Sequence, residues 1–212
     1  MLCLFDLDGT LIDSEQGITA CIRHALTRLE LPLPPPAELR RWIGPPLRRS
    51  FAPLLDHDAD RIEAAVGHYH ERFDTLGWRE HAVYPGIEAL IGLLRGAGHR
   101  LVVVTSKPRQ HAEPIVAQLP FGDAFEHLYG PHPDSAHSEK TTLIADALRD
   151  FECPPGHAVM IGDRHFDIEG AVANHVRGIG VLWGFGDRDE LEQAGATAMV
   201  ATPAALAQML LA

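Results

Sequence analysis

The sequence predicts a doubly wound, parallel α/β sheet into which a small all-helical domain is inserted. Two observations carry this prediction. Short apolar runs that end in turn-forming residues alternate with segments of helical spacing, a pattern typical of βαβ units. Residues 14–83 interrupt the alternation, because they contain only helical patterns. We therefore expect a Rossmann-like core formed by residues 1–13 and 84–212, and a helical domain formed by residues 14–83.

The first expected strand is the short apolar run Leu2–Phe5, which ends at Asp6-Leu7-Asp8-Gly9-Thr10-Leu11. Its length favours a buried strand over a helix. The two carboxylates repel each other unless a cation or a proton lies between them, and hard oxygen ligands of this kind suit Mg²⁺. Gly9 permits a sharp turn, and Thr10 offers a hydroxyl and an amide to an anion. An acidic strand end without a ligand is the alternative.

The helical stretch begins near Ser14, where apolar residues recur at helical spacing as far as Leu29. The prolines of residues 31–36 end that helix, and Gly44-Pro45-Pro46 makes a second break. A further apolar stripe runs from Ile62 to Leu76. We find no strand pattern in this stretch, which therefore reads as a helical bundle.

After residue 84 the pattern returns to alternating strands and helices. Expected strands are Leu101–Val104, His127–Gly130, Ala158–Ile161, Ile179–Trp183 and Ala198–Ala201. Helical segments separate them, and open α/β sheets of this kind bind ligands beyond the carboxyl ends of their strands.

Composition limits the classes of function. The formal charge of −11 argues against a nucleic-acid-binding surface. Three scattered cysteines suggest that the protein works in a reducing compartment inside the cell. The apolar residues before Asp6 are too few for a signal peptide or a membrane span. We expect a cytoplasmic protein with no nucleic-acid or membrane partner, and the sequence leaves a monomer and a dimer both open.

Polar clusters stand at the carboxyl end of each informative strand. They are Asp6 with Asp8, Thr105 with Ser106, and Asp163 with Asp167, while Lys140 opens a helix that can face the same place. Taken alone, Thr105 and Ser106 are typical of a helix cap. Gly162-Asp163 alone is typical of a helix cap too, with Asp167 as an acidic residue in the first turn of the following helix. Together they supply a phosphate site at a helix N-terminus and a second carboxylate pair for Mg²⁺.

Lysine is rare in this chain: Lys107 and Lys140 stand against 16 arginines. Mutational bias that replaces Lys by Arg explains the ratio, so a surviving lysine marks a position that needs a compact ammonium. We expect Lys140 to enter the site. Lys107 is expected to follow the phosphate-binding turn rather than enter it.

The four motifs together resemble those of the haloacid dehalogenase-like hydrolase superfamily. They are Asp6-Leu7-Asp8-Gly9-Thr10-Leu11, Thr105, Lys140 and Gly162-Asp163 with Asp167, in that order. The helical stretch resembles the inserted cap of that superfamily. The chain is most similar to the phosphoglycolate phosphatase-like branch, as residues 43–47 and 179–184 also suggest. Thr141-Thr142 after Lys140 departs from the usual Lys-Pro form of the third motif.

The resemblance implies roles for these residues. Asp6 would attack phosphorus to form an aspartyl phosphate, and Asp8 would protonate the leaving group and then activate water. Thr105 would hold a phosphoryl oxygen, with Gly9, Thr10 and Ser106 beside it, and Lys140 would neutralise the nucleophile and phosphate. Asp6, Asp163 and the backbone carbonyl of Asp8 would hold Mg²⁺, while Asp167 supports that metal shell.

Residues that contact the leaving group are harder to identify. Arg48 flanks the break in the helical domain and can reach a substrate, although a solvated or packing role is the alternative. His132 and His137 lie in a loop before Lys140 and are further candidates.

The implied activity is Mg²⁺-dependent hydrolysis of a small phosphomonoester through an aspartyl phosphate. Phosphoglycolate, a sugar phosphate and a nucleotide all remain open as substrates. A phosphomutase of the same superfamily is the nearest alternative, and a non-catalytic phosphate-binding module is the alternative from another class. A module without catalysis is expected to lack Asp6 or Asp8, and both are present.

Overall fold

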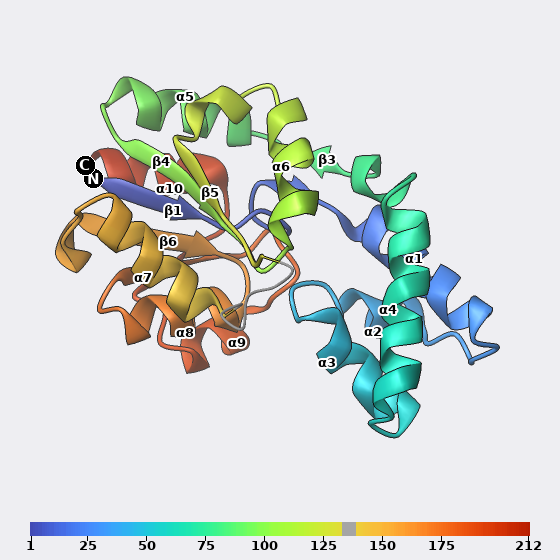
Figure 1. Ribbon diagram of the computed structural model, residues 1–212. Coiled ribbons are helices and arrows are strands. Elements are labelled where there is room, and N and C mark those ends of the chain that lie inside the picture. The colour runs from blue at the N-terminus through green and yellow to red at the C-terminus, as the bar shows by residue number, and fades with distance from the viewer. Residues whose placement is uncertain (133–138) are drawn as a thin grey trace. The chain divides into compact units, whose positions relative to one another are not determined.

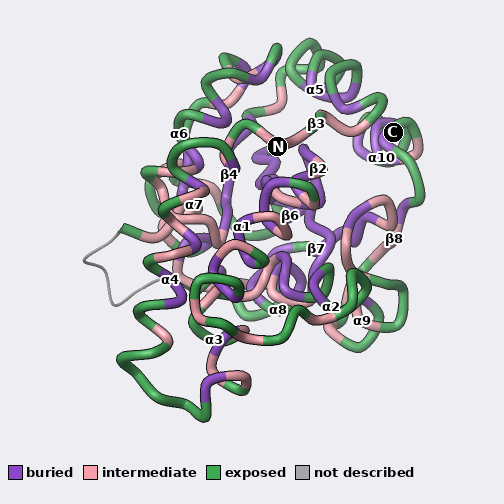
Figure 2. The backbone as a smooth tube through the Cα atoms, turned by 90° about the vertical axis from the view of Figure 1, so that its right-hand side faces the viewer, coloured by how far each residue is buried: buried purple, intermediate pink, exposed green. Residues whose placement is uncertain are grey.

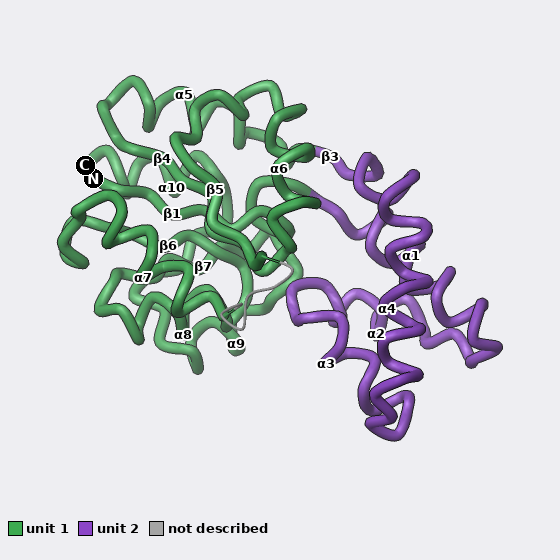
Figure 3. The backbone as a smooth tube through the Cα atoms, in the orientation of Figure 1, with its two compact units in different colours: residues 1–12, 83–212 green, residues 13–82 purple. Residues whose placement is uncertain are grey.

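The computed structural model describes residues 1–132 and 139–212, so His137 lies outside the described residues. The chain forms two compact units (Figure 3). Unit 1 comprises Met1–Ile12 and Val83–Ala212, and unit 2 comprises Asp13–Ala82. The first unit is therefore assembled from two stretches of chain, with the second unit inserted between them.

Unit 1 is built on a parallel sheet whose strand order is β5-β4-β1-β6-β7-β8 (Figure 1). The strands are β1 (Leu2–Phe5), β4 (Arg100–Val104), β5 (His127–Tyr129), β6 (Ala158–Gly162), β7 (Arg177–Val181) and β8 (Ala198–Val200). β1 pairs with β4 on one side and with β6 on the other. The strand order therefore reverses at β1, and the carboxyl end of this strand is where a doubly wound fold places its ligand. The predicted fold class is confirmed.

Helices cover both faces of the sheet (Figure 1). α7 (Lys140–Asp150) and α8 (His165–Ala173) pack together, and their apolar residues share a core with Leu4, Val104 and Met160. α5 (Ile87–Gly96) and α10 (Pro203–Leu211) pack together on the opposite face. Further helices of unit 1 are α6 (Arg109–Gln118), α9 (Arg188–Gln193), η3 (Gly122–Ala124) and η4 (Pro155–His157). The central strands are buried on both sides (Figure 2), which explains why their sequences are continuously apolar.

β7 ends earlier than predicted. The strand covers Arg177–Val181, whereas the sequence suggested Ile179–Trp183. Trp183 leaves the sheet because its indole N–H donates to the carbonyl of Thr10, at 3.0 Å. The apolar run thus continues past the end of β7 into a turn that is hydrogen-bonded to the loop after β1.

Unit 2 is mainly helical. Its helices are α1 (Glu15–Arg28), α2 (Pro36–Arg40), α3 (Leu47–Phe51), η1 (Ala52–Leu55), α4 (Ala59–Phe73) and η2 (Gly77–Arg79). α1 packs against α4, with the buried residues Ile22 and Leu26 on one helix and Tyr69 and Phe73 on the other. The apolar stripes seen in the sequence are the surfaces that these two helices bury.

Two short strands join the units, and they correct the expectation that the inserted stretch has no strand. β2 (Ile12–Asp13) pairs with β3 (Ala82–Val83). Two residues are too few to give a periodic pattern in the sequence. Among the described helices, none combines the length and apolar character needed to cross a bilayer.

Candidate active site

Asp6 follows β1 directly, at the point where the strand order reverses. Its N–H donates to the carbonyl of Ile161, at 2.9 Å, which extends the pairing of β1 with β6 by one residue. The chain then turns at Gly9, whose φ is +81°. A Cβ at Gly9 would overlap the carboxylate of Asp163. The turn therefore requires glycine both for its backbone conformation and for space.

Gly9 and Thr10 use their donors within this turn. The N–H of Gly9 donates to the carbonyl of Ile12, at 2.8 Å, and that of Thr10 points at the carbonyl of Leu7, at 3.4 Å. The Thr10 hydroxyl donates to Oδ1 of Asp163, at 3.4 Å. Within this turn the donors of Gly9 and Thr10 face groups of the protein, and the Thr10 hydroxyl supports Asp163; their role as donors to an anion stays a prediction.

Three buried carboxylates meet at the ends of β1 and β6. Asp6, Asp163 and Asp167 each place one oxygen within 4.8 Å of an oxygen of the other two. Asp163 follows β6, and Asp167 lies in the first turn of α8, where its Oδ2 accepts the N–H of Arg164 at 3.0 Å. The Asp8 carboxylate does not belong to this group. We name Asp6, Asp163 and Asp167 the carboxylate cluster.

Lys140, the first residue of α7, points its ammonium into the carboxylate cluster. Nζ lies 2.9 Å from Oδ1 of Asp6 and 2.8 Å from Oδ1 of Asp167, and it donates to the carbonyl of Val104 at 2.9 Å. An ammonium has three N–H groups, and here three oxygens surround it. The side chain is only 4% exposed, so these contacts replace its hydration almost completely.

The charges of the carboxylate cluster remain unbalanced. Burial raises the pKa of Asp6 from 3.8 to about 6, although the ammonium of Lys140 opposes the shift. Burial and the charges of Asp167 and Asp6 also raise the pKa of Asp163 well above its usual value. Burial alone would lower the pKa of Lys140, but Asp167 and Asp6 outweigh it and raise that pKa. One ammonium therefore does not neutralise three carboxylates that are buried from solvent.

A divalent cation fits this arrangement. Oδ1 of Asp6 and Oδ1 of Asp167 are buried, and apart from their ion pairs with Lys140 they accept no aligned hydrogen bond from the described residues. Carboxylate oxygens are the ligands that Mg²⁺ prefers, and a positive ion among them would offset the burial and the mutual repulsion that raise the pKa values of Asp6 and Asp163.

Thr105 lies at the same edge of the sheet, because β4 pairs with β1 in the register Phe5 with Val103. It is 1% exposed, and its N–H donates to the carbonyl of Tyr129 at 2.9 Å. Its hydroxyl oxygen accepts the N–H of Lys107, at 3.2 Å. Since the oxygen is the acceptor in that bond, the hydroxyl proton can be donated to an anion. Ser106 follows in the same turn and is half-buried.

Lys107 enters the site, contrary to the expectation from its place in the sequence. Its Nζ lies 3.1 Å from Oδ2 of Asp8, and the exposed fractions of the two side chains are 7% and 11%. The turn after Thr105 bends the chain so that Lys107, three positions beyond the end of β4, points back toward the loop after β1. The scarcity of lysine was the signal that could have identified it.

The turn after β7 was also missed as part of the site. The N–H of Phe185 donates to Oδ2 of Asp163, at 2.7 Å. A Cβ at Gly184 would overlap the carbonyl of Gly9, and a Cβ at Gly186 would overlap that of Asp163. Two glycines that alternate with aromatic residues after a strand were the available signal. The turn holds Asp163 against the loop after β1.

Glu190 of α9 fixes the other side of this region. Its Oε1 accepts the N–H of His165 at 2.9 Å and the Nε–H of Arg164 at 2.8 Å, and it contacts Nδ1 of His165 at 2.8 Å. Arg164 and His165 lie between Asp163 and Asp167 in the sequence. Glu190 therefore holds the backbone that positions both carboxylates.

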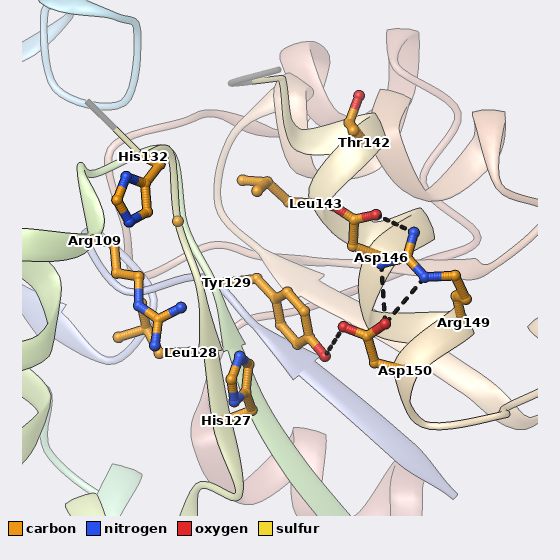
Figure 4. A pocket seen from close by; sticks show the side chains of 11 residues that line it. Arg109, His127, Leu128, Tyr129, His132, Thr142, Leu143, Asp146, Arg149 and Asp150 are labelled. Atoms are coloured by element: carbon orange, nitrogen blue, oxygen red, sulfur yellow. Dashed lines mark hydrogen bonds and ion pairs between the residues drawn. The ribbon is translucent and has the colours of Figure 1, made fainter. Parts of the chain in front are cut away.

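The remaining candidates lie elsewhere in the two units. Arg48, on α3 of unit 2, gives two N–H groups to the carboxylate of Glu63, and its side chain is 63% exposed. His132 lines a cavity of about 660 Å³ between β5, α7 and the start of α6, together with Arg109 and Tyr129 (Figure 4). No member of the carboxylate cluster lines that cavity.

Comparisons with known proteins agree with this site. The family model described as haloacid dehalogenase-like hydrolase matches residues 3–181. A 5'-nucleotidase of Pseudomonas aeruginosa is 42% identical over 207 residues, which cover 98% of this chain and 94% of that protein. The tyrosine-protein kinase PtkA of Mycobacterium tuberculosis is 35% identical over 197 residues, covering 92% and 67%. The crystal structure of a predicted phosphatase from Clostridium acetobutylicum superposes with a TM-score of 0.94 at 36% identity, covering 99% and 97% of the two chains.

The chain belongs to the haloacid dehalogenase-like hydrolase family, as its motifs suggested. The fold, the family and the names of its relatives support a phosphatase of this family that acts on phosphorylated substrates.

The crowding of carboxylates leads to a prediction about stability. Asp163→Asn removes a buried charge but keeps an oxygen for the N–H of Phe185. Burial, followed by the charges of Asp167 and Asp6, raises the pKa of Asp163 well above its usual value, so the folded state holds this proton more tightly than the unfolded chain and loses stability as pH rises. In the presence of chelator the variant should therefore have a higher Tm, and more so near pH ~7.5 than near pH ~5. Each kcal/mol corresponds to about 2–4 °C here.

Thermal unfolding followed by circular dichroism measures this effect. Asp123→Asn is the matched control, because Asp123 is an exposed carboxylate of the same unit, paired with Arg95. We expect its Tm to stay close to that of the wild type. A lower Tm for metal-free Asp163→Asn would contradict the repulsion within the carboxylate cluster.

A second prediction concerns the shape of the cation. Lys140→Ala should lose on the order of 10²-fold or more in rate, the range of a lost electrostatic catalyst. Lys140→Arg should not restore it, because a planar guanidinium cannot place N–H groups on Asp6, Asp167 and the Val104 carbonyl in the space of one ammonium. Steady-state kinetics of the purified variants measure both. An Arg variant near wild-type activity would show that charge alone suffices.

Proposed function

We propose that this protein is a Mg²⁺-dependent phosphomonoesterase that hydrolyses a small phosphorylated metabolite through an aspartyl phosphate. One observation carries the proposal: a buried aspartate at the end of the central strand lies against a lysine ammonium and a second carboxylate pair, while Asp8 stands apart from them. A nucleophile, an acid–base group and a charge-stabilising group are what covalent phosphoryl transfer requires.

In this mechanism Asp6 attacks phosphorus through a carboxylate oxygen and expels the alcohol. Asp8 gives a proton to the leaving oxygen, and then takes one from the water that hydrolyses the aspartyl phosphate. The hydroxyl of Thr105 donates to a phosphoryl oxygen, with Ser106 beside it. Lys140 keeps Asp6 ionised and offsets the charge that accumulates in the transition state.

Asp6, Asp163 and the backbone carbonyl of Asp8 would hold the metal, with Asp167 in support. Bound there, Mg²⁺ supplies a positive charge that neutralises phosphoryl oxygens and the crowded carboxylates. The charge balance of the cluster supports this assignment, because one ammonium faces three buried carboxylates.

Unit 2 serves in this proposal as the cap that selects the leaving group, with Arg48 as a contact to the substrate. A nucleoside monophosphate is the first substrate to test, since the 42% identical relative is named a 5'-nucleotidase. Phosphoglycolate and sugar phosphates follow as the other candidates.

Transfer to an acceptor other than water is the second candidate, and the tyrosine-protein kinase among the relatives favours it. A kinase and a phosphomutase both keep the phosphoryl group on an organic oxygen. The two functions therefore differ in one product, inorganic phosphate.

A panel of phosphorylated metabolites tests the proposal. We expect nucleotides, sugar phosphates or phosphoglycolate to release inorganic phosphate with Mg²⁺ and to release none in excess chelator. Ca²⁺ should restore little activity, because it is larger and less strict in its geometry. Arg109→Ala is a suitable control for the handling of variants, since Arg109 forms an exposed pair with Glu113 outside the carboxylate cluster. Full turnover in chelator would remove the metal assignment, and transfer to tyrosine without release of phosphate would favour the second candidate.

The covalent step has its own test. Asp6→Asn lacks the nucleophile, so both half-reactions should stop. Asp8→Asn keeps the nucleophile and loses the acid and base, which contribute typically about 10²- to 10⁴-fold. With an aryl phosphate the leaving group departs unaided, so Asp8→Asn should give a burst of phenol near one per site and retain phosphate on Asp6.

Rapid-mixing kinetics and mass spectrometry of the quenched protein detect these signals. With an alkyl phosphate the same variant should accumulate nothing, because the poor leaving group needs its proton. A folded Asp8→Asn that shows neither burst nor label with the aryl phosphate would remove the covalent mechanism.

A further inference from the structure

Both lysines of the chain meet the two aspartates of the first motif. Lys140 contacts Asp6, and Lys107 contacts Asp8, at 2.9 and 3.1 Å. Where only a positive charge is required, this chain uses arginine, of which it has 16. Two independent observations, composition and geometry, therefore single out Lys107, whose side chain is 7% exposed.

The backbone of Lys107 is held in place. Its N–H donates to the hydroxyl oxygen of Thr105, at 3.2 Å. A Cβ at Gly130 would press on the carbonyl of Lys107, so the chain after β5 runs directly against this residue. The N–H of Arg109 is in turn fixed by the carbonyl of Pro131, at 3.0 Å. Because the N–H of Lys107 is hydrogen-bonded and its carbonyl is enclosed, the backbone from which its side chain extends is fixed.

The carboxylate of Asp8 is oriented by this contact. Its Oδ2 faces Nζ of Lys107, whereas its Oδ1 is buried and accepts no hydrogen bond from the described residues. A carboxyl group that rotated freely would spend little time aimed at a leaving oxygen. An ammonium on one oxygen fixes the plane of the carboxyl group and so its direction toward the reacting atoms.

We propose that Lys107 is a positioning residue for Asp8: its ammonium holds Oδ2 and thereby fixes the direction in which the carboxyl group meets the leaving oxygen of the substrate and later the attacking water. The proposal rests on the proposed function, since it assigns Lys107 to the acid–base half of that reaction. Lys140 then serves the nucleophile and Lys107 serves the acid and base, and the division explains why two separate ammonium groups are present.

Two other roles for Lys107 give different kinetics. An ammonium that binds the phosphoryl group directly would act on every substrate and would still matter after Asp8 had lost its function. An ion pair that only stabilises the fold would lower Tm and affect all substrates equally. A residue that acts through Asp8 affects the first half-reaction only of those substrates whose leaving group needs a proton, and only while Asp8 can supply it.

The test is a double-mutant cycle of Lys107→Met, Asp8→Asn and the double variant, each with one alkyl and one aryl phosphate. Lys107→Met should lower kcat for the alkyl phosphate by about tenfold or more, a part of the 10²- to 10⁴-fold of acid–base catalysis. The burst of phenol from the aryl phosphate should keep its rate within about a factor of three, because that step needs no proton. In the Asp8→Asn background, Lys107→Met should cause no further loss, since residues that act as a unit are non-additive.

Arg109→Met is the matched control: it removes a cation two residues along the chain, from an exposed pair with Glu113, and should leave both substrates unaffected. Tm values of all variants exclude unfolding as a cause. If Lys107→Met does not fold, Lys107→Gln is the substitute, since it is polar but uncharged and too short to hold Oδ2 from the same backbone position, and the same difference between the two substrates is expected.

Equal losses in the first half-reaction on both substrates, or additive losses in the double variant, would overturn the role of Lys107. Turnover by the wild type would then leave the proposed function in place. A wild type without phosphatase activity on the panel would instead remove the proposed function and this inference together. A raised KM for both substrates that persists in the Asp8→Asn background would assign Lys107 to the phosphoryl group.

Discussion

The ammonium of Lys140 among buried carboxylates is the contact on which the site depends. It joins β1, β4, α7 and α8 at one point, through Asp6, the Val104 carbonyl and Asp167. Removing one partner from such a group leaves another buried charge without compensation, which is costly, typically 3–5 kcal/mol. The apolar core on that face, which includes Leu4, Val104 and Met160, holds the four elements in register while the site itself remains electrostatically unfavourable.

Glycine determines how closely the backbone surrounds the carboxylate cluster. Gly9, Gly162, Gly184 and Gly186 each lack room for a Cβ because Asp163 or Asp167 occupies the space. The loop after β1, the end of β6 and the turn after β7 thereby lie directly against Asp163 and Asp167. Backbone that packs directly against the carboxylate cluster excludes water from it. The exclusion of water strengthens every charge interaction inside the site. The fold thus produces the low dielectric that raises the pKa of Asp6 and makes a buried lysine effective.

The sequence predicted the sheet and the edge where polar groups meet, because both follow from local patterns. An apolar run of four or five residues identifies a buried strand, and the carboxyl ends of parallel strands lie together. The direction of a side chain is not a local property. Lys107 points to Asp8 only because the turn after Thr105 bends back, and Trp183 leaves β7 only because the carbonyl of Thr10 accepts its N–H. Both depend on residues more than 90 positions away in the chain.

The relatives of this chain include a 5'-nucleotidase and a tyrosine-protein kinase, and the proposed mechanism explains how one site can serve both chemistries. In the proposed mechanism the first half-reaction would be the same for both chemistries: Asp6 attacks phosphorus and the leaving group departs. The fate of the phosphoryl group is decided in the second half-reaction, when Asp8 activates whichever hydroxyl group reaches the aspartyl phosphate. Water and a phenol present the same O–H to that carboxylate. In this mechanism the carboxylate cluster would determine the attack on phosphorus, whereas the acceptor would depend on groups that control access to Asp8.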